Sequence, residues 1–183
     1  MINNDSTIFS IGHGNRSFED FFDILNSYNI EFLIDVRSNP RSRFYPHFNR
    51  KNLETNSSSF GIRYLFLGDT LGGKPKDRSC YDAEGHVDYD LVMEKEFFKD
   101  SANRLLVANA KKIRVACMCS ETKPCECHRS KMIGEYLKKY DIEMQHIDKE
   151  GRLISQTKVI SEIIGDNENL FPDDISFKSR GKY

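Results

Sequence analysis

The sequence predicts an α/β protein built around a mostly parallel sheet, with helices on both faces. Short apolar segments of strand length alternate with longer segments in which apolar residues recur at helical spacing. This alternation is typical of parallel sheets with right-handed crossovers. The length of 183 residues suits one compact domain. We expect that domain to span residues 1–165, followed by a loosely packed tail over residues 166–183.

The first unit of this pattern is a strand, a loop and a helix. Residues 7–11 are apolar enough for a buried strand, and the glycines of residues 12–14 end it. Ser17 is the candidate N-cap of the helix that follows. The apolar residues of this helix recur at helical spacing; they are Phe18, Phe21, Phe22 and Leu25. A second buried strand is expected over residues 30–36.

The next stretch begins with an irregular segment. Residues 38–47 contain two prolines and no periodicity, so we expect an ordered loop and no helix. A helical turn is expected over residues 49–55 and a third strand over residues 61–67. Residues 74–88 are polar, and we expect a mobile loop there.

The second half of the chain repeats the alternation. We expect a long helix over 90–112, a fourth strand over 113–118, a helix over 128–140, a fifth strand over 142–147 and a helix around 157–164. A Cys-rich loop directly follows the fourth strand. In parallel sheets ligands bind outside the carboxyl ends of the strands, so the loops after successive strands are expected to form one site.

Composition excludes several classes of protein. Apolar residues make up 38% and charged residues 30%, with 13 Phe and 8 Tyr, so a disordered chain is not expected. No apolar run approaches the roughly 20 residues that span a bilayer, and the first residues do not resemble a signal peptide. Four of the five Cys lie between Cys117 and Cys127, which favours a reducing compartment over a disulfide scaffold. We therefore expect a cytoplasmic protein without a membrane partner.

Positive charge is concentrated in one part of a nearly neutral chain. The formal net charge is −1, but residues 35–78 hold nine Lys/Arg against four Asp/Glu. Arg37, Arg41 and Arg43 follow the second strand, and guanidinium groups bind phosphate oxygens in a bidentate manner. These arginines are predicted to bind an anionic substrate. The alternative is that some form structural ion pairs, with Asp35, Glu54 or Asp69 as partners.

Several segments resemble those of the family known as domain of unknown function 488. They are Ser10-Ile11-Gly12-His13-Gly14, the stretch from Asp35 to Arg43, the stretch from Tyr64 to Gly73, Cys119-Ser120-Glu121 and Cys127-His128-Arg129. The resemblance spans about positions 7 to 147. It implies a three-layer Rossmann-like fold and supplies no established activity. Tyr64 and His128, within these segments, complete the set of predicted anion-binding residues.

Cys127 and Arg129 stand where a helix is predicted to begin. A helix N-terminus and an adjacent Arg lower the pKa of a thiol, so Cys127 is a candidate nucleophile. Arg129, with the helix N-terminus, is a candidate anion-binding site. The alternative is that Cys127 is a small buried residue and that Arg129 ties the loop to Glu121.

The cysteines also raise the question of a metal. Cys117, Cys119, Cys125, Cys127 and His128 offer up to five soft ligands, enough for tetrahedral zinc. The usual zinc spacing of two Cys separated by two residues is absent here, and Cys117 and Cys119 belong to the end of a strand. We therefore expect neither a metal nor a cofactor.

Glu121 and His13 are the remaining candidates for chemistry. A carboxylate shortly after a strand end can act as a general base or as a nucleophile, although Glu121 could equally pair with Arg37 or Arg129. His13 lies between two glycines that allow close approach of a ligand. The predicted function is an enzyme acting on a nucleotide or nucleic acid, a hydrolase or transferase of nucleobase or sugar-phosphate substrates. The alternatives are a thiol-dependent enzyme or redox sensor using Cys127, and a non-catalytic nucleic-acid-binding module.

Overall fold

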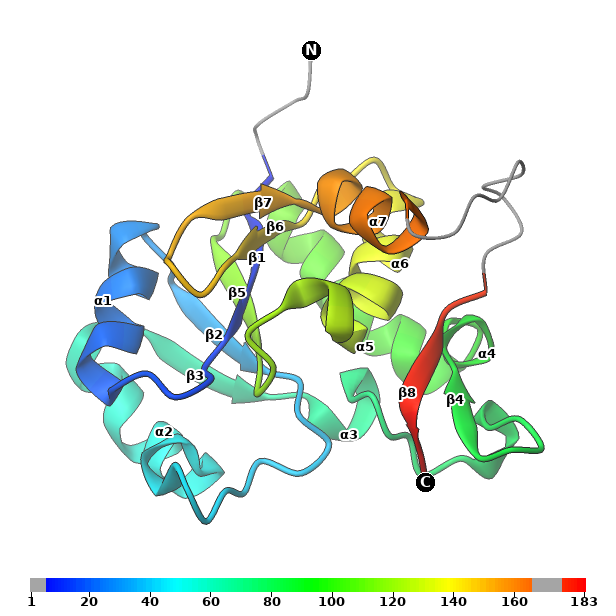
Figure 1. Cartoon of the computed structure of the whole chain (residues 1–183). Coiled ribbons are helices and arrows are strands. Elements are labelled where there is room, and N and C mark those ends of the chain that lie inside the picture. Colours follow the sequence, from blue (N-terminus) through cyan, green and yellow to red (C-terminus); the bar gives the residue numbers. More distant parts are fainter. Residues whose placement is uncertain (1–5, 166–175) are drawn as a thin grey trace.

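A computed structural model describes residues 6–165 and 176–183, and its centre is a six-stranded sheet (Figure 1). The strands are β1 (Ile8–Gly12), β2 (Phe32–Asp35), β3 (Arg63–Phe66), β5 (Val115–Cys119), β6 (Gln145–Ile147) and β7 (Leu153–Ser155). Their order is β3-β2-β5-β1-β6-β7; the first five are parallel, and β7 pairs antiparallel with β6. The three-layer Rossmann-like fold and the mostly parallel sheet are therefore confirmed.

Helices cover both faces of this sheet (Figure 1). The α-helices are α1 (Phe18–Ser27), α2 (Arg50–Asn56), α3 (Gly68–Leu71), α4 (Tyr89–Met93), α5 (Glu96–Ala110), α6 (Glu135–Lys138) and α7 (Gln156–Gly165). Ser17 caps α1 as predicted, because its hydroxyl accepts a hydrogen bond from the Asp20 amide at 3.0 Å. Among the described residues, no helix combines the length and apolar character that a membrane crossing needs.

The alternation of side chains along the strands divides the core into two parts. In β5, Ala116 and Met118 pack on the face covered by α1, whereas Val115, Cys117 and Cys119 pack on the face covered by α5. This alternation is the two-residue period of a strand. It places the Cys119 side chain on the α5 face, at the carboxyl end of β5.

Two expected helices differ in detail from the structure. The helix expected over 90–112 is interrupted between α4 and α5, where Lys95 adopts an extended backbone at the N-cap position of α5. The helix expected over 128–140 begins as a π-helix (Arg129–Gly134) and continues as α6. Wide π-type turns are frequent near functional sites, and this one directly follows the Cys-rich loop.

The segment expected to be a mobile loop contains ordered structure. Strand β4 (His86–Asp88) lies within residues 74–88 and pairs antiparallel with β8 (Lys178–Lys182). Cys80 and Val87 are fully buried in the core, which fixes this segment in place. Of the tail expected over 166–183, residues 166–175 lie outside the described part of the chain, while β8 is a paired strand and no loose tail.

The sheet register brings three strand ends to the same level. Gly12 pairs with Cys119, and Asp35 pairs with Met118. Beyond the strands, the His13 amide donates a hydrogen bond to the Cys119 carbonyl at 2.9 Å, and the Val36 amide donates to the Met118 carbonyl at 3.1 Å. The loops that follow β1, β2 and β5 therefore leave the sheet side by side.

Candidate functional site

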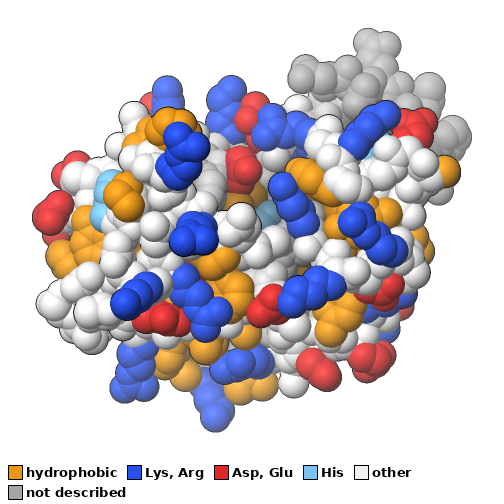
Figure 2. All heavy atoms as spheres, turned by 90° about the horizontal axis from the view of Figure 1, so that it is seen from below, with side chains coloured by type: hydrophobic (Ala, Val, Ile, Leu, Met, Phe, Trp, Pro, Cys, Tyr) orange, Lys and Arg blue, Asp and Glu red, His pale blue; other side chains and the backbone are white. Residues whose placement is uncertain are grey.

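A pocket of about 440 Å³ lies over the carboxyl ends of β2 and β5. One wall comes from the loops after these strands and includes Glu121, Cys127 and His128. The other wall comes from β8 and the adjoining residues, with Arg180 and Tyr183. Figure 2 views the molecule from below relative to Figure 1, and Lys and Arg side chains are spread across this face without forming one patch. A pocket of this volume is within the usual range for small-molecule sites.

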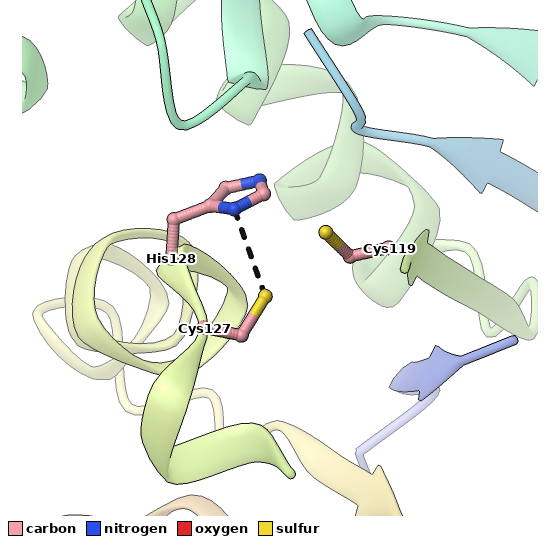
Figure 3. Close-up of side chains that lie close together, drawn as sticks. All are labelled: Cys119, Cys127 and His128. Atoms are coloured by element: carbon pink, nitrogen blue, oxygen red, sulfur yellow. Dashed lines mark hydrogen bonds between the residues drawn. The ribbon is translucent and has the colours of Figure 1, made fainter. Parts of the chain in front are cut away.

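Two thiols and an imidazole form a cluster in the pocket wall (Figure 3). The sulfur atoms of Cys119 and Cys127 point toward each other, and the His128 ring lies beside them (Figure 3). The ligand atoms of these three residues lie within 4.8 Å of one another. We call Cys119, Cys127 and His128 the thiol–imidazole cluster. It joins the end of β5 to the start of the π-helix.

The His128 ring has a defined orientation. Its Nε2 lies 3.1 Å from the Val36 carbonyl oxygen, which can only accept a hydrogen bond, so Nε2 carries a proton. The other ring nitrogen, Nδ1, faces the Cys127 sulfur at 3.6 Å. Gly73 allows this packing, because a Cβ atom there would lie 2.9 Å from His128 Nδ1.

Glu121 is the carboxylate of the site. Its side chain is exposed to the pocket, and its Oε2 accepts a hydrogen bond from the Cys119 thiol at 2.8 Å. The Cys127 sulfur is 3.7 Å from the same oxygen. A Cβ atom at Gly12 would lie 1.8 Å from the Glu121 carbonyl oxygen, so only glycine lets the loop after β5 approach β1 this closely.

Arg129 lies beneath the cluster and is fully buried. Its guanidinium donates from Nε to the Cys127 sulfur at 3.2 Å, from Nη1 to the Ser10 hydroxyl at 3.2 Å and from Nη2 to the Glu121 carbonyl oxygen at 2.5 Å. A buried positive charge needs a negative partner, and the Cys127 sulfur is the group in contact that can supply one. In this structure Arg129 holds the loop and the sulfur and does not line the pocket.

The two thiols have opposite acidities. Burial opposes ionisation of Cys127, but hydrogen bonding from Cys119 and the charges of Arg129 and His128 lower its pKa well below the ordinary value. The hydrogen bond to Cys127, together with burial, raises the pKa of Cys119 well above the ordinary value. Cys119 has a single S–H, so it can donate either to Cys127 or to Glu121 at one time. Both shifts favour Cys127 over Cys119 as the thiol that ionises first.

Arg37 forms a buried ion pair next to the pocket. Its guanidinium binds Asp35 through two hydrogen bonds, from Nε at 2.9 Å and from Nη2 at 2.6 Å, and it also donates to the Phe48 carbonyl oxygen at 2.7 Å. The Tyr64 hydroxyl donates to the same Asp35 carboxylate at 2.7 Å. The alternative of a structural ion pair with Asp35 thus describes the Arg37 contacts, and Tyr64 shares in them.

His13 belongs to the same buried network. Its ring stacks on Phe48 with a centroid distance of 4.4 Å, and its Nδ1 donates to the Gly14 carbonyl oxygen at 2.9 Å. Burial and the neighbouring Arg37 charge lower the pKa of His13 to about 4. The ring is therefore neutral at pH 7, and Nε2 faces Arg37 Nη1 at 3.3 Å as an acceptor.

The remaining predicted arginines lie away from the pocket. Arg41 and Arg43 are exposed on the loop after β2 and are not among the residues that line the pocket. The structure thus brings Glu121, Cys127 and His128 together in the pocket wall, with Arg37 at its edge.

Two cations of the pocket were not singled out from the sequence. Lys74 lies with its Nζ 3.9 Å from the Tyr183 ring centroid, and Arg180 forms an ion pair with Glu126 at 3.1 Å. Among the described residues, no carboxylate pairs with Lys74. Neither residue belongs to a motif, and only the pairing of β8 with β4 brings Arg180 to the site. The only local signal was the excess of positive charge over residues 35–78, which includes Lys74.

The chain was compared with known families, curated proteins and solved structures. The family model described as Domain of unknown function DUF488 matches residues 17–137. No curated protein and no solved structure matches the chain. The matched span includes the thiol–imidazole cluster and Glu121, and it ends before β8.

Proposed function

The chain belongs to the DUF488 family, a domain of unknown function, and we propose that it is an enzyme acting on a small phosphate-bearing substrate through Glu121. The observation that carries this proposal is the exposed Glu121 carboxylate in a polar pocket at the carboxyl ends of parallel strands. A nucleotide is the substrate class that we favour.

The pocket offers groups for both parts of a nucleotide. Lys74 and Arg180 supply positive charge for a phosphate. Tyr183, which is 46% exposed, also lines the pocket, and aromatic rings bind nucleobases by stacking. These groups take the place of Arg41 and Arg43, which are exposed elsewhere on the loop after β2.

Glu121 acts as the general base in this proposal. Its carboxylate accepts the proton of the attacking water or hydroxyl group, which forms the new bond to the substrate while the leaving group departs. A hydrolase uses water as the attacking group, and a transferase uses an acceptor hydroxyl. General acid–base catalysis of this kind contributes about 10²- to 10⁴-fold to rate.

The test compares Glu121 with a carboxylate outside the pocket. Purified protein is incubated with nucleoside mono-, di- and triphosphates and with sugar phosphates, and products are followed by phosphorus NMR and chromatography. For the substrate found, we expect Glu121→Gln to lower kcat by about 10²- to 10⁴-fold with little change in binding by calorimetry. Glu94→Gln should keep kcat, because Glu94 is an exposed carboxylate that does not line the pocket. The proposal is wrong if no compound is converted or if Glu121→Gln retains full kcat.

A second function, thiol-dependent catalysis by Cys127, is favoured by one contact. Arg129 Nε lies 3.2 Å from the Cys127 sulfur, which supports a thiolate in the pocket wall. In that case Cys127→Ser abolishes turnover on the same panel of compounds and Glu121→Gln does not. The two variants therefore separate the two functions.

A further inference from the structure

We propose that the thiol–imidazole cluster binds one zinc ion, held by the sulfur atoms of Cys119 and Cys127 and by Nδ1 of His128. This site goes beyond the proposed function and does not depend on it, because metal binding is measurable without a substrate. It also differs from our expectation, based on cysteine spacing, that no metal is bound. Two of the four clustered cysteines take part.

The spacing of the donor atoms suits a tetrahedral zinc ion. Zn–S bonds of about 2.3 Å and Zn–N bonds of about 2.0–2.1 Å at tetrahedral angles place sulfur and nitrogen about 3.6 Å apart and two sulfurs about 3.8 Å apart. The observed distance from Cys127 Sγ to His128 Nδ1 is 3.6 Å. All donor atoms of the cluster lie within 4.8 Å of one another, so small side-chain shifts complete the geometry.

The hydrogen bond of His128 prepares the ring for a metal. A metal-binding histidine usually donates its second ring N–H to a carbonyl or carboxylate, which leaves the other nitrogen lone pair facing the metal. His128 Nε2 donates to the Val36 carbonyl oxygen in this way. Nδ1 is therefore the ring nitrogen left to bind a metal, and it faces the Cys127 sulfur (Figure 3).

The charges around the cluster also favour a cation. The sulfur atoms of Cys119 and Cys127 lie 2.8 and 3.7 Å from Glu121 Oε2, so three groups that can carry negative charge once deprotonated lie together. The proton of the Cys119 thiol lies in its hydrogen bond to the Glu121 carboxylate. Zinc replaces this proton, which is released to solvent, and Arg129 remains in contact with the Cys127 sulfur as an outer partner.

The cysteines outside the cluster have different places. Cys117 points into the core on the α5 face and is fully buried, and Cys125 is half-buried in the loop after β5. Of the four clustered cysteines, Cys119 and Cys127 are the proposed ligands, Cys117 is a core residue, and Cys125 can serve as a control.

A zinc ion held by these three ligands would keep one coordination position for a further ligand, on the side of the pocket and Glu121. All three ligand residues and Glu121 line the same pocket. A zinc ion with three protein ligands and an open fourth position is the arrangement of catalytic zinc sites, in which a bound water is activated. A Cys127 sulfur bound to zinc is not free to act as a nucleophile, so zinc binding and thiol-dependent catalysis exclude each other.

The experiment measures zinc and cobalt binding to the full chain under reducing conditions. Protein stripped with a chelator is titrated with Co²⁺, and zinc affinity is measured by competition with a chromophoric chelator. We expect one metal per chain and a thiolate-to-cobalt charge-transfer band. Cys119→Ser and Cys127→Ser should each weaken zinc binding by more than the 10- to 100-fold that loss of an outer partner costs, while Cys125→Ser should bind like the parent.

Alkylation provides a second measurement that does not depend on folding of the variants. In the parent protein, zinc should slow alkylation of Cys119 and Cys127 and leave Cys125 unaffected, as mapped by mass spectrometry. The proposal is overturned if the parent binds no stoichiometric metal, if Cys119→Ser keeps the parent affinity, or if Cys125→Ser loses it to the same extent. Equal alkylation of Cys119 with and without zinc would also overturn it.

Discussion

Replacing Arg37 by Met tests whether this arginine supports the fold. The guanidinium and the Asp35 carboxylate are 4% and 0% exposed, and two hydrogen bonds join them. Removing one partner of a buried pair leaves an uncompensated charge and costs about 3–5 kcal/mol. Solvent screening does not reduce this figure, because both groups are buried. For a chain of this length the loss corresponds to a fall in Tm of roughly 6–20 °C.

Urea and thermal denaturation, followed by circular dichroism, measure this loss. Arg152→Met is the matched control, because Arg152 pairs with Asp148 at 3.2 Å and its side chain is 74% exposed. An exposed pair contributes about 0–1 kcal/mol, so the control should change stability little. If Arg37→Met were as stable as Arg152→Met and yet bound no phosphate compound, Arg37 would be a substrate-binding residue and the structural reading would be refuted.

Three further predictions concern the fold and the site. Burial lowers the pKa of His146 from 6.5 to about 4; the unfolded chain therefore takes up this proton first, and stability should fall by up to about 3 kcal/mol between these pH values. His146→Asn should show a shallower fall in Tm over that range, and an unchanged pH profile would contradict this. Gly12→Ala should cost about 1–3 kcal/mol in urea denaturation, because its Cβ would overlap the Glu121 carbonyl oxygen, while Gly165→Ala, with nothing within 4 Å, should cost nothing. Ser17→Ala should lower stability by about 0.5–2 kcal/mol through loss of the α1 cap, and no change in the urea midpoint would exclude that contribution.

Local sequence patterns were sufficient for the central part of the fold. Strands β1, β2 and β5 are short apolar runs, and α1 has a capping serine and a regular apolar face, so each was recognisable without its partners. Strands β4, β7 and β8 were not predicted. Strands β4 and β7 have three residues each, and β8 is Lys-Ser-Arg-Gly-Lys. All three depend on pairing with another strand and not on a local pattern.

For the candidate site too, local sequence patterns were informative and long-range contacts could not be predicted. The rule that ligands bind at the carboxyl ends of parallel strands predicts that the loops after these strands meet, and Glu121, Cys127 and His128 do lie in one pocket wall there. Contacts that depend on side-chain packing were beyond the sequence, such as the choice of Arg37 between Asp35 and a substrate. The place of Arg180 was also hidden, because it follows from the pairing of β8 with β4.

The two walls of the pocket come from two different sheets, because β8 belongs to the small β4–β8 sheet. The wall with Glu121 and the thiol–imidazole cluster is fixed by the register of the large sheet, whereas Arg180 stands on a strand paired only with β4 in the described structure (Figure 1). Substitutions on β8 can therefore alter the pocket lining without disturbing the large sheet. The two walls of the pocket can then diverge independently in evolution, and an engineered library confined to β8 would vary one wall while Glu121 and the thiol–imidazole cluster stay unchanged.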